Sequence, residues 1–432
     1  MPVRPAAHLV ADLAQVLLGV PLPLGLRCWD GSEVAGPAGS PTLVVRSPKA
    51  LRRIVYAADE LGLARAYVSG DLDIEGDLYA TLQFPDALPA RPEMRLDRRA
   101  LAPLLGDLVR TGVLGWPVPP PAEEARLRGL RHSLRRDRAA ISHHYDVGNE
   151  FYALLLGPSL VYSCAYYEAP DSTLEEAQQS KLDLVCQKLA LRPGMRLLDV
   201  GCGWGSLVLH AAAHYGVEAV GVTISPEQGE LARRRVVKAG LEGRVEIRLQ
   251  DYRAVDDGPY DAIASVGMAE HVGRAQFPAY AAGLHALLAP GGRLLNHAIA
   301  RGPAAGPDQG DGARSFLTRY VFPDGELQPL ADHVAFLEGA GFEVRDVEGL
   351  REHYALTCRA WVRNLEQHWD DAVGVVSPAR ARVWRLYLAG SALAFEGRRV
   401  GVNQILATKA GAPGPGGEPW QLRRPAWGSG DS

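Results

Sequence analysis

From position 174 onward, segments in which apolar residues have the spacing of a helix alternate with segments that have the pattern of a strand. Segment 174–191, LEEAQQSKLDLVCQKLAL, has an apolar residue every three or four positions and follows Ser172 and Thr173, two good N-cap residues, so it is predicted to be a helix. Strands alternating with crossover helices form a parallel sheet with both faces covered, which predicts an α/β fold. The strands are expected within 195–203, 218–225, 244–252, 260–268 and 291–300, and the helices between them within 204–215, 226–240 and 277–290.

The N-terminal part of the chain has a different pattern. Residues 1–118 mix short helical and extended signals, which indicates a smaller α+β domain, and the proline-rich stretch GWPVPPPAEEA that closes it is typical of a linker. The six arginines of segment 126–138 either form a solvated helix face or meet anionic headgroups. We therefore predict four parts: an N-terminal domain at 1–118, a Pro- and Arg-rich linker at 119–140, the α/β domain at 141–409 and a disordered tail at 410–432.

Composition narrows the class of protein. The chain has 432 residues, 47% of them apolar and 22% charged, as is ordinary for a soluble globular protein. A net charge of -4 argues against a nucleic-acid partner. The five cysteines are scattered without metal-ligand spacing, so neither a metal site nor a disulfide framework is expected, and with no long apolar run or signal peptide the prediction is a cytoplasmic protein.

The first expected strand is followed by a glycine-rich stretch, DVGCGWG, at Asp199–Gly205. Glycines in this position let the backbone approach a ligand closely at the start of a helix. The spacing differs from the G-x-G-x-x-G of dinucleotide sites. It resembles the S-adenosylmethionine loop of the seven-strand Rossmann-like methyltransferases, whereas a purely structural turn is the alternative.

Several further motifs occur in the order found in one known family. They are HYDVGNEFY at 144–152, YSCAYYE at 162–168, VGVTIS with Gln228, QDYR at 250–253, GMAEHVG at 267–273 and YVFPDGELQPL at 320–330. Together with DVGCGWG they resemble the cyclopropane-fatty-acyl-phospholipid synthases and their methyl-transferring relatives, from about residue 144 to 409. GLARAYVSGDLDIEGDL at 62–78 is similar to the N-terminal domain of the long bacterial members.

The resemblance implies a reaction and its residues. Such enzymes add the methyl carbon of S-adenosylmethionine to the cis double bond of an unsaturated acyl chain in a membrane phospholipid, and a bound bicarbonate removes a proton from the resulting carbocation. An alkene is a weak nucleophile, so the site must align it and exclude water. The residues carried over as catalytic are Cys164, Glu270, His297, the backbone of Ile299, and Tyr354. The cofactor-binding residues are Tyr162, Ser163, Asp199, Gly201, Gly203, Thr223, Ile224, Gln228, Asp251 and Tyr252.

Each catalytic candidate also has an ordinary interpretation as core, cap or packing residue, so the hypothesis depends on their convergence. The product is either a cyclopropane or a methylene-branched chain, such as the 10-methylene stearoyl of the tuberculostearic acid relatives. Peripheral contact with the inner face of the membrane is expected, through segment 126–138 and apolar residues of the N-terminal domain, and a homo-oligomer is common in the family. The alternatives are a small-molecule methyltransferase and a non-catalytic lipid-binding protein.

Overall fold

The computed structural model describes residues 4–18, 20–57, 59–87, 98–125, 147–305, 315–323 and 325–411. Segment 126–138, most of the stretch 301–313 and the tail from 412 lie outside this part of the chain. The chain divides into two compact units. The first unit consists of Met1–Arg126, Ala313–Val321 and Ser377–Leu393, and the second of Leu127–Gly312, Phe322–Val376 and Ala394–Ser432.

The first unit is an α+β fold around a small sheet. The strand order is β2-β1-β3-β4, with β1 and β3 parallel and the two outer pairs antiparallel. Leu9, Leu26, Val45 and Leu108 belong to its apolar core. The strands are β1 (Gly25–Cys28), β2 (Glu33–Val34), β3 (Thr42–Val45) and β4 (Leu72–Glu75), and the helices are α1 (Ala6–Leu18), α2 (Pro48–Tyr56), α3 (Glu60–Val68), α4 (Leu78–Ala87), α5 (Arg98–Arg110) and α13 (Phe316–Tyr320).

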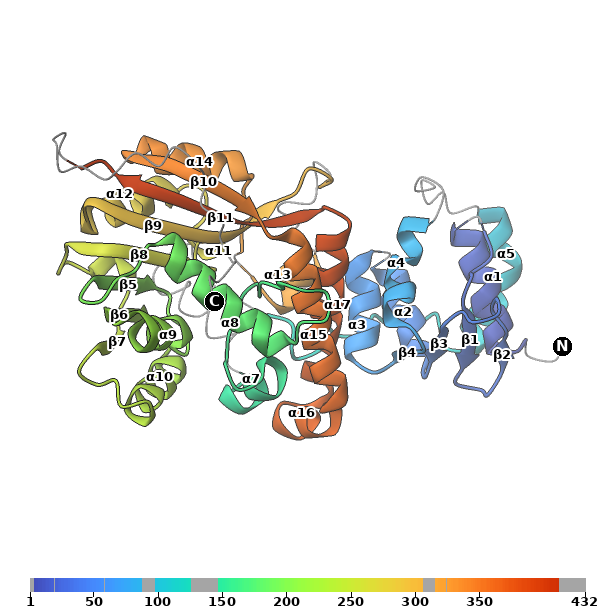
Figure 1. Ribbon diagram of the computed structural model, residues 1–432. Helices are drawn as coiled ribbons and strands as arrows, with labels where there is room; N and C mark the ends of the chain where they lie inside the picture. The colour runs from blue at the N-terminus through green and yellow to red at the C-terminus, as the bar shows by residue number, and fades with distance from the viewer. Residues whose placement is uncertain are drawn as a thin grey trace. The chain divides into compact units, whose positions relative to one another are not determined.

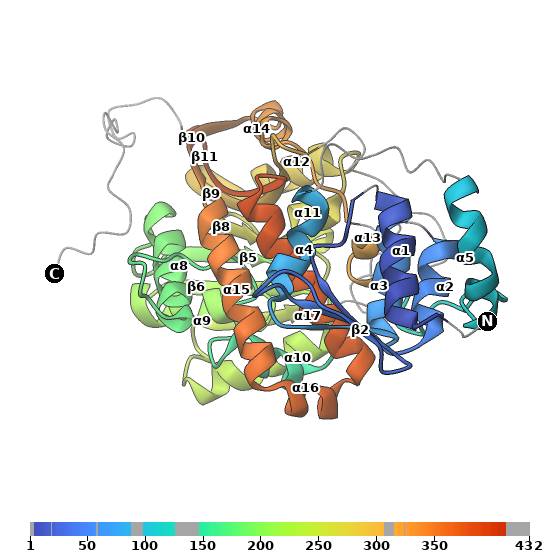
Figure 2. The same ribbon diagram turned by 90° about the vertical axis from the view of Figure 1, so that its right-hand side faces the viewer.

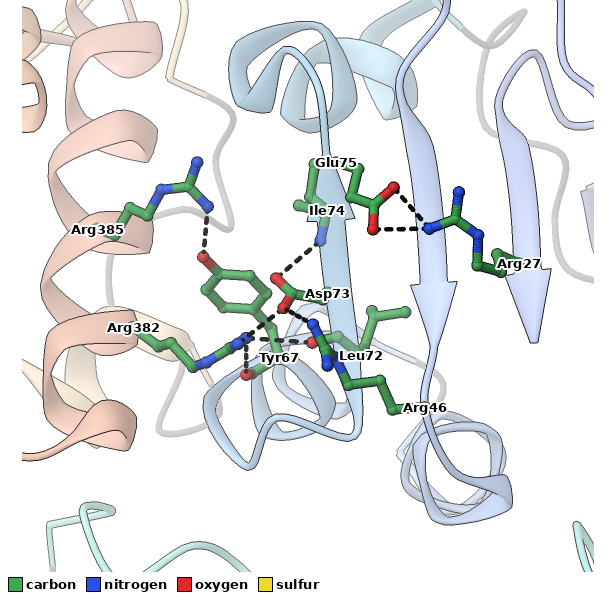
Figure 3. A network of polar contacts seen from close by, with 9 residues as sticks. All are labelled: Arg27, Arg46, Tyr67, Leu72, Asp73, Ile74, Glu75, Arg382 and Arg385. Atoms are coloured by element: carbon green, nitrogen blue, oxygen red, sulfur yellow. Dashed lines mark hydrogen bonds and ion pairs between the residues drawn. The ribbon is translucent and has the colours of Figure 1, made fainter. Parts of the chain in front are cut away.

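Helix α17 (Pro378–Glu396) joins this unit although it comes late in the sequence. Arg382 donates to Asp73 on β4 at 2.8 Å, and Arg385 donates to the hydroxyl of Tyr67 at 3.0 Å (Figure 3). Segments 313–321 and 377–393 were predicted to belong to the domain 141–409. The structure groups them with the N-terminal elements instead, and the ion pair of Arg382 and the hydrogen bond of Arg385 join segments that lie far apart in the sequence.

The second unit contains a seven-stranded sheet with the order β10-β11-β9-β8-β5-β6-β7 (Figure 1). The strands from β9 to β7 pair in parallel, and β11 runs antiparallel to both of its neighbours. The predicted seven-stranded α/β sheet is therefore confirmed. The strands are β5 (Arg196–Val200), β6 (Glu218–Thr223), β7 (Val245–Leu249), β8 (Tyr260–Val266), β9 (Leu288–Arg301), β10 (Phe342–Gly349) and β11 (Val400–Lys409).

Helices cover both faces of this sheet, and alternating strand residues enter two separate cores. Leu197 packs with α8 (Leu174–Lys188), α9 (Ser206–Tyr215) and α10 (Pro226–Lys238). Leu198 packs on the other face with α11 (Ala269–Val272), α12 (Phe277–Leu287) and α14 (Leu330–Gly339). The ribbons of α8 and α9 are seen on one side of the sheet and those of α12 and α14 on the other (Figure 2). Thr173 caps α8 with a reciprocal bond to Glu176, as its sequence position predicts. The remaining elements are α7 (Asn149–Leu156), the 3-10 turn η1 (Tyr252–Ala254), α15 (Arg351–Gln367) and α16 (Trp369–Val375).

Within the described ranges, no helix has both the length and the apolar character needed to cross a bilayer.

Candidate active site

A tight turn of three glycines connects β5 to α9. Gly201, Gly203 and Gly205 have φ angles of +83°, +54° and +79°, a region that glycine adopts without steric cost. A Cβ added to Gly201 would lie 2.5 Å from Sδ of Met268. The turn therefore depends on glycine, both for its backbone conformation and for the space around it.

A cavity of about 190 Å³ lies beside this turn, where β5, β6, β7 and β8 end at their carboxyl edge. Ligands of open α/β sheets bind at this edge, near the point where the strand order reverses. The lining contains all ten residues that we predicted to hold the cofactor: Tyr162, Ser163, Asp199, Gly201, Gly203, Thr223, Ile224, Gln228, Asp251 and Tyr252.

Two buried charges stand at one end of the cavity. Lys181 of α8 donates to the hydroxyl of Ser163 at 3.0 Å, and both Lys181 and Asp199 are almost completely buried. Burial lowers the pKa of Lys181 to about 8, an effect that Asp199 opposes. Burial likewise raises the pKa of Asp199 to about 7, and Lys181 opposes that rise. Lys181 was not among the predicted residues, although its spacing of four from Ala177 and Val185 places it on the buried face of the helix.

The end of β6 carries neutral polar groups where many cofactor sites have an acid. The hydroxyl of Thr223 donates to Oε1 of Gln228 at 3.2 Å, and Ser225 caps α10 by accepting from the backbone of Gln228. All three side chains are buried, and those of Thr223 and Gln228 line the cavity. They offer both donors and acceptors to a polar ligand.

The far wall of the cavity comes from the turn after β7. Asp251 accepts from the guanidinium of Arg253 at 2.8 and 2.7 Å, so its carboxylate is ion-paired with a neighbour that also lines the cavity. The ring of Tyr252 meets that of Tyr280 edge-on at 5.4 Å. An aromatic face and an ion-paired acid therefore border this end.

Glu270 and Ile299, both predicted to be catalytic, contact each other directly. The backbone N–H of Ile299 on β9 donates to Oε1 of Glu270 at 2.6 Å. Oε2 of Glu270 is buried and has no hydrogen-bond partner among the described residues. Burial raises the pKa of Glu270 to about 7, against the opposing effect of the Ile299 N–H. The Ile299 N–H, expected to face bicarbonate, is thus engaged by Glu270.

His297 lies two residues earlier on β9 and is 2% exposed. Its Nδ1 is 3.2 Å from the side-chain nitrogen of Gln404, and its Nε2 is buried without a partner in the part of the chain that the structure describes. Burial lowers the pKa of His297 to about 3, with a further effect from the positive charges of Lys181 and Lys188. The imidazole is therefore neutral.

Cys164 and Tyr354 meet at the carbonyl of Leu350. The Cys164 thiol lies 3.6 Å from this oxygen, which also accepts the backbone N–H of Tyr354 at 3.1 Å. Burial raises the pKa of the Cys164 thiol well above its ordinary value, so the sulfur stays protonated. Leu350 donates in turn to Val402, the β11 residue paired with Ile299.

Glu270, His297 and Ile299 thus lie on or against β9, whereas Cys164 and Tyr354 are linked to the neighbouring strand β11 through the backbone of Leu350. None of the five lines the cofactor cavity. The two groups of residues are nevertheless adjacent in the fold. Met268 and His271 of the lining flank Glu270 in sequence, and Val266 of the lining is paired with His297 across β8 and β9.

Comparison with known proteins agrees with this architecture. Residues 132–405 match the family model of mycolic acid cyclopropane synthetase. The chain is 42% identical over 417 residues to the probable fatty acid methyltransferase Rv3720 of Mycobacterium tuberculosis, covering 94% of this chain and 95% of the relative. It is 38% identical over 286 residues to the cyclopropane-fatty-acyl-phospholipid synthase of Escherichia coli K12, covering 66% and 71% of the two chains.

A solved structure of mycolic acid cyclopropane synthase CmaA1, complexed with SAH and CTAB, is also similar. It has 34% sequence identity and a TM-score of 0.59, and the match covers 63% of this chain and 98% of CmaA1.

Fold, cavity and relatives define a methyltransferase that depends on S-adenosylmethionine. The chain belongs to the mycolic acid cyclopropane synthetase family, whose members include fatty acyl methyltransferases and cyclopropane synthases. The recognition made from the motifs is thus confirmed at the level of the family and of the reaction class.

Proposed function

We propose that the protein transfers the methyl carbon of S-adenosylmethionine to the cis double bond of an unsaturated acyl chain, such as oleoyl, in a membrane phospholipid. The double bond attacks the sulfonium methyl, the S–CH3 bond breaks with release of S-adenosylhomocysteine, and a carbocation remains on the acyl chain. Loss of a proton from the new methyl closes a cyclopropane. Alternatively, a 1,2-hydride shift moves the positive charge to the methyl-bearing carbon, and loss of a proton from the methyl then leaves a methylene branch. The observation that carries this proposal is the pair of buried polar atoms without a partner among the described residues, Oε2 of Glu270 and Nε2 of His297, beside the cofactor cavity.

An aromatic row supports a cationic intermediate. The ring of Tyr162, in the cavity lining, lies 5.2 Å from that of Trp361, which lies 5.9 Å from Tyr354; Tyr354 stacks on Phe395 at 4.6 Å. The faces of aromatic rings attract cations, most strongly away from water. The ring faces of such a row can stabilise positive charge on an acyl chain.

The two buried polar atoms fit a small oxyanion. Nε2 of His297 can donate to it, and a carboxyl group such as that of Glu270, with a pKa of about 7, can donate when protonated or accept when ionised. We propose that these two residues hold bicarbonate, with Cys164 and Tyr354 nearby. When bound, bicarbonate would supply a base for the final deprotonation.

The cavity itself is proposed to hold S-adenosylmethionine, with the methionine end near Tyr162 and Ser163, the ribose near Thr223 and Gln228, and the adenine near Asp251 and Tyr252. At the methionine end, we add Lys181 to the predicted set. Its ammonium, bonded to Ser163, suits the cofactor's carboxylate, while Asp199 suits the positively charged groups.

The test is to mix purified protein with methyl-labelled S-adenosylmethionine and vesicles bearing oleoyl chains. Label in the acyl fraction supports the proposal. Label in headgroups or in soluble amines would instead support a small-molecule methyltransferase, and absence of label a non-catalytic lipid-binding protein. Mass spectrometry and NMR of the lipid then distinguish a ring from a methylene branch.

Contact with a membrane surface at its cytoplasmic face is also proposed. In the first unit, Trp116 is 88% exposed, and Tyr56, which donates to the backbone of Gly115, and Val109 are exposed as well. Aromatic side chains of this kind favour the interface of a bilayer. Co-sedimentation with anionic vesicles should weaken in Trp116→Ser, and equal binding of this variant and the wild type would exclude a role for Trp116.

A further inference from the structure

A row of polar residues crosses three adjacent strands of the second unit's sheet. Glu348 of β10 is paired with Gln404 of β11, and Gln404 is paired with His297 of β9. Directly paired residues on neighbouring strands project to the same face of a sheet. Lys188, the last residue of α8, reaches this row from the covering helix and is completely buried, as is Gln404.

Hydrogen bonds fix the direction of every group in the row. The ammonium of Lys188 donates to the carboxylate of Glu348 and, at 2.7 Å, to Oε1 of Gln404. An ammonium only donates, so the amide oxygen of Gln404 must face it. The amide nitrogen then faces Nδ1 of His297, at 3.2 Å, and this nitrogen also only donates.

The consequence for His297 is a single tautomer. Nδ1 must accept the hydrogen bond from Gln404, so the ring proton resides on Nε2. Protonation of Nδ1 would place two N–H groups against each other in a buried site, and the nearby ammonium of Lys188 adds repulsion. Nε2 is the ring nitrogen that is buried without a partner among the described residues.

We propose that Lys188 and Gln404 are positioning residues, which hold His297 as a neutral imidazole with its proton on Nε2. This inference rests on the proposed function of the site and makes it more specific. His297 is a hydrogen-bond donor to the oxyanion and offers it no lone pair, so it does not act as the base. The proton released from the acyl chain must leave through another group.

The direct test reads the tautomer of His297 in the ligand-free full-length protein. Protein labelled with ¹⁵N-histidine is examined by long-range ¹H–¹⁵N correlation, and the signals of His297 are assigned from their loss in His297→Gln. We expect a proton on Nε2 and a bare Nδ1. A proton on Nδ1, or a mixture of tautomers, would overturn the inference.

Variants test whether the row sets the tautomer. Gln404→Glu replaces the hydrogen-bond donor that faces His297 by an acceptor, so His297 should gain a proton on Nδ1. The value of kcat should then fall about 100-fold, the order expected for loss of one preorganised donor. The KM for S-adenosylmethionine should be unchanged. Lys188→Arg keeps a donor for the amide oxygen and should keep the tautomer, whereas Lys188→Met should yield a mixture. An unaltered tautomer in Gln404→Glu would refute the positioning role.

Asn403→Asp is the matched control, because it introduces the same change of amide to carboxylate one position earlier, on the opposite face of β11. It should leave the tautomer and kcat unchanged. Sodium bicarbonate should shift the Nε2 proton signal of the wild type, and absence of a shift would argue against a donor role toward this anion. The tautomer measurement needs no turnover, so a protein without acyl methyl transfer but with the expected tautomer would refute the proposed function and leave the row intact.

Discussion

The substitution Glu270→Gln removes a proposed catalytic group while it preserves the local structure of the site. The amide keeps an oxygen to accept the N–H of Ile299, so the local fold should persist. It removes the titratable group whose second oxygen is buried without a partner among the described residues. We expect methyl transfer to be abolished and the affinity for S-adenosylmethionine to remain close to that of the wild type, because Glu270 is not part of the cavity lining.

The same substitution predicts a change in stability with pH. Burial raises the pKa of Glu270 from 4.5 to about 7, an interval that corresponds to about 3 kcal/mol. The folded protein therefore keeps a proton that the unfolded chain releases. For this reason the free energy of unfolding of the wild type falls as pH rises from the unfolded pKa through the folded one. The amide introduced by Glu270→Gln cannot titrate, so the variant should gain about 2.5 kcal/mol relative to the wild type between about pH 5 and pH 9.

The assay is urea unfolding of both proteins in decarbonated buffer across this pH interval, together with calorimetric titration of S-adenosylmethionine. All other titrating groups are shared, so the difference between the two proteins isolates Glu270. Parallel stability curves over this range would show that the carboxyl is ionised in the folded state at low pH. Wild-type turnover by the variant would remove Glu270 from the reaction.

Three further substitutions test other parts of the structure. Lys181→Met should weaken binding of S-adenosylmethionine by about tenfold or more in calorimetry, the effect expected for loss of a charged hydrogen bond. Binding of 5′-methylthioadenosine should be unchanged, because this compound lacks the carboxylate. Gly201→Ala should destabilise the fold by about 1–2 kcal/mol and also reduce the affinity for the cofactor. Gly240 is the control, because it has a φ of +67° and open space around it. In paired unfolding and binding measurements, Gly240→Ala should show only the loss of stability. Arg382→Met should destabilise the first unit by about 1–3 kcal/mol in urea unfolding, because it removes a partly buried partner of Asp73. Arg46→Met removes an exposed partner of the same carboxylate and should destabilise the unit by less than about 1 kcal/mol.

The sequence predicts those features that depend on local pattern. The apolar run before Asp199 and the following glycines determine both β5 and the turn, since only glycine adopts these φ angles freely. The capping box at Thr173 is equally local. Lys181 could have been found in the same way, from a charged residue on the apolar face of a predicted helix.

Features that depend on pairing between distant segments of the chain could not be predicted from the sequence. In the sequence Gln404 is one of several polar residues within β11, beside Asn403. Its role comes from pairing with Glu348 and His297, which requires the register of three strands. The ionisation of Glu270 likewise depends on burial by segments far away in the chain. The order of the motifs, by contrast, was sufficient to identify the family.

The first unit is built from segments that lie far apart in the sequence, and this has a consequence for its folding during synthesis on the ribosome. Its sheet is encoded before residue 76, yet Arg382, the partner of Asp73, emerges more than 300 residues later. At ordinary translation rates this delay is on the order of 15–60 s. During that time Asp73 and Tyr67 lack the hydrogen bonds that Arg382 and Arg385 of α17 donate, so the first unit acquires these contacts only when the last third of the chain is being translated.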